Sequence, residues 1–415
     1  MSAITRSDQK LDHPLRPSSQ SPLLSSFEDQ DKIFSAAFSV LLEAIQQRVF
    51  PAASIAITRA GKLLALKSFG KFVYEEDLKG APLLAEFARN GDIDPSKTLF
   101  DLASLTKPIA TTTMAMILYE RGLLELDAPL VAIVPEFLLD SSDPRRRDVT
   151  VRMLLAHSSG LPAYERLFLK ASSRDELLRA AFTSPLTANP DTRAEYSDIG
   201  FIILGTALER LAEESLDAFC QREIFGPLAM AHTTFNPPAD TRETIPPTAD
   251  ERPACGAGAP ARESPLASEP HTGRRNRIIQ GEVQDENAFV LGGVAGHAGL
   301  FATAEDVARF AHTMLHGGAP ILNPQTVTLF TTREAHPSGT TRTLGWDTPS
   351  LPSQSGKYFG PRSYGHLGYT GTSLWIDPDR QLSITLLTNR TWPDCSNQAI
   401  KQLRPKFHDA VIGKH

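Results

Sequence analysis

A serine and a lysine three residues apart, Ser104 and Lys107, form the pattern in this 415-residue chain that is best suited to chemistry. Serine is a weak nucleophile at neutral pH, and it needs a base within hydrogen-bonding distance and a positive field that stabilises its alkoxide. Residues three apart share one face of a helix, so the Lys107 amine is expected beside the Ser104 hydroxyl. The same spacing at Ser7 and Lys10 lies in a polar segment, so the pattern alone does not assign a function.

The elements around Ser104 are predicted to position it between a strand and a helix. Residues 98–102 are typical of a short buried strand, and an apolar helix is expected from Ser104 to about Gly122, which would bring the positive end of the helix to the serine. The alternative, without a catalytic role, is that Ser104 only caps this helix, because serine is a common N-cap residue.

Strand patterns lie near both chain ends and helix patterns lie between them. Strands are predicted over residues 53–58, 62–68, 373–378 and 382–389, and the main helices over residues 33–49, 149–156, 174–182, 199–211, 215–225, 303–316 and 396–411. This order predicts an α+β fold: a central antiparallel sheet from both chain termini, flanked by helices, with an inserted, mostly helical domain.

Composition divides the chain further. Residues 1–26 are polar and predict a disordered leader, and residues 27–412 predict one domain. Its sheet subdomain is expected at about 30–105 and 290–412, and its helical subdomain at about 106–289. Residues 237–277 are rich in Pro, Ala and Glu with few large apolar side chains, and they predict a surface excursion from the helical part.

Charge and composition exclude several classes of protein. The net charge of −6 argues against a nucleic-acid partner. No apolar stretch predicts a membrane segment, and no secretory signal is recognisable, so a cytoplasmic protein is expected, with a periplasmic one as the alternative. His312 and His316 are four residues apart but have no third ligand nearby, so no metal site is expected. The oligomeric state is left open.

Two further motifs accompany Ser104-Leu105-Thr106-Lys107. Tyr196-Ser197-Asp198 precedes an apolar helix, and residues 366–371, with the sequence His-Leu-Gly-Tyr-Thr-Gly, precede a strong strand. Together with residues 155–162 and 281–302, these motifs resemble the serine β-lactamase and penicillin-binding-protein family over roughly residues 30–410. The class C-related branch, which includes D-alanyl peptidases and β-lactamase-type esterases, is the most similar.

The resemblance implies a role for each motif. Ser104 would be the nucleophile, and Lys107 or Tyr196 would be the base, with the choice between them left open. The backbone N–H groups of Ser104 and Tyr369 would form the oxyanion hole, and Gly368 would let the strand come close to the substrate. No cofactor is implied.

Two departures from the family pattern bear on the substrate. The second motif ends in Asp198 where Asn is common, and an ionised Asp would pair with Lys107 and shift the base role toward Tyr196. The third begins with His366 and Leu367 where Lys-Thr is common, so a substrate carboxylate is expected to be held less well. Asp198, His366, Gly368 and His297 are the predicted substrate-binding residues.

These observations predict a cofactor-free serine hydrolase that acts through an acyl-enzyme on carboxylic esters or small amides. One alternative is a D,D-peptidase or β-lactamase acting on cell-wall-type substrates. A second alternative is a non-catalytic β-lactamase-like binding scaffold. The expected partner is a small-molecule ester, amide or β-lactam.

Overall fold

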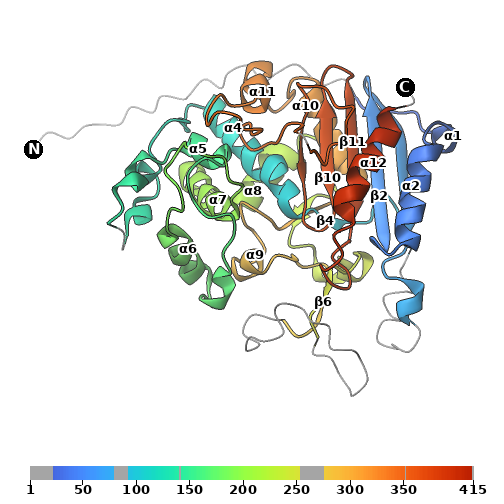
Figure 1. Ribbon diagram of the computed structural model, residues 1–415, viewed down its shortest axis with the longest axis horizontal. Coiled ribbons are helices and arrows are strands. Elements are labelled where there is room, and N and C mark those ends of the chain that lie inside the picture. The colour runs from blue at the N-terminus through green and yellow to red at the C-terminus, as the bar shows by residue number, and fades with distance from the viewer. Residues whose placement is uncertain (1–21, 79–91, 140–141, 253–274, 351, 414–415) are drawn as a thin grey trace, which may run out of the picture.

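The main sheet is built from both ends of the chain, in a computed structural model that describes residues 22–78, 92–139, 142–252, 275–350 and 352–413 (Figure 1). Its six strands lie in the order β1-β3-β2-β11-β10-β9. They are β1 (Leu24–Ser25), β2 (Ala52–Arg59), β3 (Lys62–Gly70), β9 (Tyr364–Leu367), β10 (Ser373–Asp377) and β11 (Leu382–Thr388). All neighbours pair antiparallel except β1, which runs parallel to β3. The predicted α+β fold with a sheet from both termini is confirmed.

Helices cover both faces of this sheet. On one face lie α2 (Ser35–Gln46) and α12 (Ile400–Ile412), which pack against each other and enclose one apolar core with the strands. On the other face lies α10 (Ala304–Leu315), whose N-terminus is capped by the Thr303 hydroxyl, which accepts a hydrogen bond from the Asp306 N–H. The central strands β2 and β11 are buried along nearly their whole length, and each has apolar residues on both of its faces.

The inserted part of the chain is mostly helical and forms the other half of the molecule (Figure 1). The buried helix α7 packs against α4, α5, α6 and α8. The helices of this half and of the segments that return to the sheet are α4 (Thr113–Glu120), α5 (Val151–Leu155), α6 (Arg174–Thr183), α7 (Asp198–Ala212), α8 (Leu216–Cys220), α9 (Glu286–Val290) and α11 (Pro324–Thr331). The larger apolar core joins this half to the sheet.

Two short sheets complete the fold. One has the order β4-β8-β5 and consists of β4 (Phe100–Asp101), β8 (Leu300–Ala302) and β5 (Thr234–Phe235). The other pairs β6 (Ala249–Asp250) with β7 (Ile278–Ile279). The first sheet matters for the site, because β4 leads directly into the turn that carries Ser104.

Several predicted boundaries differ from the structure. Leu24 and Ser25 form β1, so they are ordered although they lie in the predicted leader of residues 1–26; residues 1–21 lie outside the described residues. Of the predicted excursion at 237–277, residues 253–274 also lie outside them, while β6 and β7 pair its two ends. None of the helices in the described ranges combines the length and apolar character that a membrane span requires.

Candidate active site

Ser104 sits in a tight turn directly after β4. The turn is a 3-10 helix, η3 (Ala103–Leu105), and Ala103 before the serine has a positive φ of 47°. A residue other than glycine is strained in this left-handed region, and residues with such backbone strain are often found at functional sites. The buried Asp101 carboxylate holds the turn by accepting a hydrogen bond from the Ala103 N–H at 2.8 Å. Burial raises the pKa of Asp101 to about 6.

Lys107 begins the next element, η4 (Lys107–Thr112), and is wholly buried. Its Nζ donates to Ser104 Oγ at 3.0 Å, to Asp198 Oδ1 at 2.6 Å and to the backbone oxygen of His297 at 3.0 Å. All three donors of the ammonium group are therefore used. The prediction of one regular helix from Ser104 is wrong in detail, because a 3-10 turn and a π-helix precede α4. The predicted contact between Ser104 and Lys107 is present.

Tyr196 approaches Ser104 from the helical half of the molecule. Its Oη donates to Ser104 Oγ at 2.7 Å. Ser197, the next residue, caps α7 by accepting a hydrogen bond from the Gly200 N–H, and its own N–H donates to His157 Nδ1 at 3.0 Å. The His157 ring also packs 4.6 Å from the Tyr196 ring. The start of α7 thus fixes both Tyr196 and Asp198.

The charge states at rest follow from these contacts. Burial opposes the charge on Lys107, but Asp198 and Tyr196 outweigh it and hold the pKa of Lys107 above its ordinary value. Burial, together with the Asp198 charge, raises the pKa of Tyr196 to about 12. At neutral pH the site therefore holds an ammonium, a carboxylate and a neutral phenol around Ser104.

His366 lies in β9, with its ring centroid 5.9 Å from that of Tyr196. Only 3% of it is exposed, and its Nδ1 donates to the Leu367 carbonyl at 2.9 Å. Burial, with the charges of Lys107 and Arg342, lowers its pKa well below the usual range, so the ring is neutral. The structure therefore contradicts the partial positive charge that the sequence suggested for His366.

The loop after β9 lies against the Ser104 turn. The Thr370 hydroxyl donates to the Asp101 carbonyl at 2.7 Å, and the Thr372 hydroxyl donates to the Leu102 carbonyl at 3.0 Å. At Gly368, a Cβ atom would lie 2.5 Å from the Leu102 oxygen, which explains the glycine. The loop that contains Tyr369 is thus tied to the residues just before Ser104.

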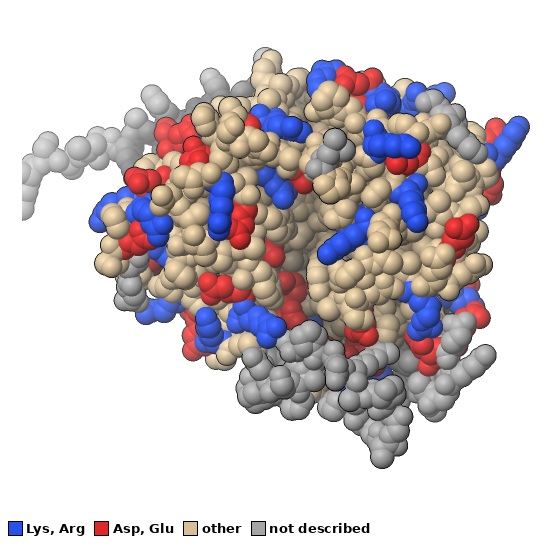
Figure 2. Space-filling model, viewed as in Figure 1, with Lys and Arg blue, Asp and Glu red and all other residues tan. Residues whose placement is uncertain are grey.

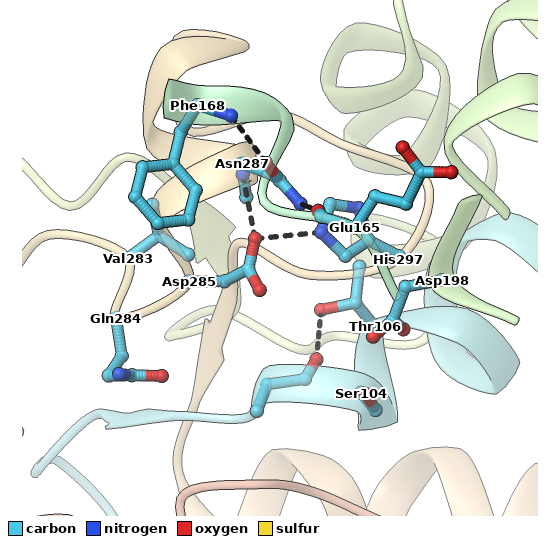
Figure 3. A network of polar contacts seen from close by, with 12 residues as sticks. Ser104, Thr106, Glu165, Phe168, Asp198, Val283, Gln284, Asp285, Asn287 and His297 are labelled. Atoms are coloured by element: carbon cyan, nitrogen blue, oxygen red, sulfur yellow. Dashed lines mark hydrogen bonds and ion pairs between the residues drawn. The ribbon is translucent and has the colours of Figure 1, made fainter. Parts of the chain in front are cut away.

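His297 contributes its backbone to the site, since its carbonyl accepts from Lys107. Its ring is turned to Asp285, with Nε2 2.8 Å from Asp285 Oδ1 (Figure 3). Burial alone would raise the pKa of Asp285, but His297 and the Ala288 N–H reverse this and lower it. Asn287, two residues after Asp285, donates to the Glu165 carbonyl and accepts from the Phe168 N–H, both in the helical half (Figure 3).

The structure brings Ser104, Lys107, Tyr196 and Asp198 into direct contact, places His366 and Gly368 beside them, and leaves the Tyr369 side chain half exposed. A hollow runs between the two halves of the molecule, with acidic and basic side chains on its walls (Figure 2).

Sequence reasoning missed Asp285 and Arg342. A signal existed only for Asp285, which falls in the family-like stretch that starts at Gly281.

A family model described as Beta-lactamase matches residues 36–404, which is most of the chain. The chain belongs to this family. It is therefore a hydrolase of the β-lactamase-related type, and the resemblance of the three motifs to this family is confirmed. The matched range includes the Ser104, Tyr196 and His366 motifs.

Two relatives match more than two thirds of the chain. A Bacillus subtilis (strain 168) protein named N-acetylmuramyl-L-alanine amidase is 31% identical over 358 residues, covering 82% of this chain and 77% of the relative. An Escherichia coli K12 protein, provisionally named as a D-alanyl-D-alanine carboxypeptidase, is 32% identical over 310 residues, covering 71% and 69%.

Solved structures share the fold. EstCE1, described as a hydrolase with promiscuous acyltransferase activity, superposes with a TM-score of 0.70 at 22% identity, covering 92% of this chain and 99% of its own. A class C β-lactamase superposes with a TM-score of 0.65 at 17% identity, covering 91% and 98%. At these identities the likeness establishes the fold and not the substrate.

Proposed function

We propose that this hydrolase forms a covalent acyl-enzyme on Ser104 and hydrolyses carboxylic esters or small amides without a cofactor. The observation that carries the proposal is the double contact on Ser104 Oγ, with Lys107 Nζ at 3.0 Å and Tyr196 Oη at 2.7 Å. A nucleophile, two candidate bases and a nearby pair of backbone donors are the parts that acyl transfer needs.

The chemical steps balance with these groups alone. Ser104 Oγ attacks the substrate carbonyl carbon, and its proton passes to the Lys107–Tyr196 pair in the form of the pair that has already lost one proton. The N–H groups of Ser104 and Tyr369 would stabilise the oxyanion. The intermediate then expels the alcohol or amine, which takes the proton from the pair. Water repeats the sequence on the acyl-enzyme, releasing the acid and restoring the Ser104 hydroxyl.

Lys107 and Tyr196 titrate as a coupled pair, so the base belongs to the pair rather than to one residue. Both are protonated at neutral pH, because the pKa of Lys107 is raised and that of Tyr196 is about 12. The active base form is the pair with one proton fewer. Its concentration rises with pH, whichever residue keeps the remaining proton.

A second candidate function is a D,D-peptidase or β-lactamase acting on cell-wall-type substrates. The names of the Bacillus subtilis and Escherichia coli relatives favour it. Both candidates use the same nucleophile, so they differ in substrate and not in the chemistry at Ser104. The third alternative is a non-catalytic β-lactamase-like binding scaffold.

The test compares turnover of p-nitrophenyl acetate, a D-alanyl-D-alanine peptide and a chromogenic cephalosporin. We expect ester hydrolysis by the native protein to be fastest and to fall about 10³-fold or more in Ser104→Ala. Ser39→Ala, an exposed serine on α2, is the control and is expected to retain activity. Faster turnover of the peptide or cephalosporin than of the ester would favour the second candidate. Undiminished turnover in Ser104→Ala, or none of any substrate, would contradict the proposal.

A further inference from the structure

We propose that Arg404, on the outer helix α12, strengthens the N–H group of Tyr369 as an oxyanion donor by binding the carbonyl of the same peptide group. Arg404 is then a positioning residue, because it acts on the substrate only through the backbone. The inference rests on the proposed acyl-enzyme function of Ser104 and deepens it, since it names a residue outside the three motifs that the reaction needs.

The loop between β9 and β10 is held from behind by the Arg404 side chain. Its Nη2 donates to the carbonyl of Gly368 at 2.6 Å and to that of Thr372 at 2.8 Å. The same two residues are also joined directly, because the Gly368 N–H donates to the Thr372 carbonyl at 2.7 Å. Nη1 donates to Gln354 at 2.8 Å, and only 4% of Arg404 is exposed. One buried guanidinium group therefore fixes both ends of the loop.

The Gly368 carbonyl and the Tyr369 N–H belong to one peptide group. This peptide is trans, so the two groups point in opposite directions. Because Arg404 holds the carbonyl toward α12, the N–H points away from that helix. Among the described residues the Tyr369 N–H donates to no protein atom, which leaves it available to a substrate oxyanion. A hydrogen bond to a carbonyl also polarises its peptide group and makes the N–H a stronger donor.

Arg404 is a buried cation without a matching anion. Within the described ranges no carboxylate pairs with it, and burial, together with the Arg390 charge, lowers its pKa to about 9. At neutral pH the guanidinium group is still charged. A buried cation normally has an acidic partner, because the removal of a charge from water is costly. Here the carbonyls of the loop take that place, and the positive field favours the negative charge that develops on the substrate carbonyl oxygen.

Two other buried arginines show what is particular to Arg404. Arg390 also binds the loop, but its Nε donates to the carbonyl of Tyr369, at 2.7 Å, which belongs to the following peptide group. Arg146 donates to two carbonyls of the helical half, at 2.8 Å each. Of these three, only Arg404 contacts the peptide group of the oxyanion donor. Arg146 therefore provides a control for the loss of a buried arginine that binds carbonyls.

Isotope-edited NMR tests the contact itself, without turnover. Of the seven tyrosines, only Tyr369 follows a glycine, so protein labelled with carbon-13 at the glycine carbonyls and nitrogen-15 in tyrosine gives a single carbonyl–amide correlation. We expect Arg404→Gln and Arg404→Lys to move the carbonyl carbon of this signal to lower chemical shift, because a carbonyl with a weaker hydrogen bond is less polarised. Arg146→Gln is expected to leave the signal in place.

The effect on catalysis is measured with p-nitrophenyl acetate and with phenylboronic acid, whose boron bonds to the Ser104 oxygen and mimics the tetrahedral intermediate. Rates are divided by the number of active sites that a fluorophosphonate titrates to completion, so misfolded protein does not count. We expect Arg404→Gln to lower kcat/KM about 10- to 100-fold and to weaken boronate binding by a similar factor, because a weaker oxyanion donor stabilises the transition state poorly. Arg404→Lys keeps the charge but lacks the planar fork, so it should lose less.

The control separates this role from a purely structural one. Arg146→Gln is expected to lower Tm, because buried carbonyls lose their donor, while kcat/KM and boronate affinity per titrated site stay native. An equal loss of kcat/KM in Arg146→Gln, or native kcat/KM in Arg404→Gln, would overturn the proposal. So would an NMR signal that does not move, or equal losses in Arg404→Lys and Arg404→Gln. If Arg404→Gln does not fold, Arg404→Lys decides: native kcat/KM in that variant would overturn the proposal.

The results also separate this proposal from the proposed function. Undiminished turnover in Ser104→Ala would overturn the acyl-enzyme proposal, whatever the NMR signal shows. Turnover that depends on Ser104 but not on Arg404 would overturn the role of Arg404 alone.

Discussion

At the scale of single residues, the site is organised by the contact between Lys107 and Asp198. The ammonium and the carboxylate lie 2.6 Å apart, and the lysine is wholly buried. Burial opposes the charge on Lys107, but the nearby Asp198 and Tyr196 favour it more strongly, which explains why the lysine stays protonated at rest. If the Lys107–Tyr196 pair is the base, as we propose, activity is expected to increase as the pair loses a proton.

The substitution Asp198→Asn tests this electrostatic role. The Asp198 charge raises the pKa of Lys107, so its removal must lower that pKa. The base form of the pair then appears at lower pH. We expect the rising limb of kcat/KM against pH to shift by the same amount toward acid. The pH–rate profile of the two proteins measures this, and superimposable profiles would contradict it.

The residue types predicted the contacts of Lys107 correctly and the charge of His366 incorrectly. The spacing of Ser104 and Lys107 predicted their contact, and Asp198 predicted the pairing with Lys107; both are present. The charge of His366 depends on burial and on Lys107 and Arg342, which are distant in sequence. Such a tertiary effect is not visible in a local motif. For the same reason, the sequence did not indicate that Arg342 lies near the site.

At the scale of elements, the site depends on close packing between the β9 loop and the Ser104 turn. Gly368 lies where these two backbones meet, and Arg404 of α12 binds its carbonyl at 2.6 Å. A helix on the outer face of the sheet is therefore connected to the loop that contains Tyr369. Local patterns predicted these elements, while the contacts between them required the whole fold.

The substitution Gly368→Ala tests this packing. The new Cβ would lie 1.9 Å from Thr372 Oγ1 and 2.5 Å from the Leu102 oxygen, so the loop must move away from the Ser104 turn. We expect a lower kcat, by about 10²-fold or more, because a displaced oxyanion donor stabilises the transition state poorly. Thermal unfolding should also show a lower Tm.

Gly360→Ala is the matched control. A Cβ there would meet no atom closer than 3.6 Å, which is ordinary van der Waals contact. Its kcat and Tm should stay near those of the native protein. A Gly368→Ala protein with native kcat would show that the loop does not need this close approach.

At the scale of the whole molecule, the two halves of the chain meet at Ser104. The strand and turn bring Ser104 and Lys107, α7 brings Tyr196 and Asp198, and the sheet brings His366 and Gly368. Alternation and helical spacing predicted the sheet from both termini, because β2 and β11 are rich in apolar and β-branched residues. They did not predict β1 or the π-helix at Lys107, because two-residue strands and local helix distortions leave little periodic signal.

The central claim is that Ser104 is an activated nucleophile, and covalent labelling tests it most directly. The native protein, Ser104→Ala and Lys107→Ala would each be incubated with a fluorophosphonate, and the adduct located by intact mass and peptide mapping. We predict one adduct per chain on Ser104 in the native protein, none in Ser104→Ala, and labelling at least about 10²-fold slower in Lys107→Ala. An adduct on another residue, or no adduct in folded native protein, would contradict the account.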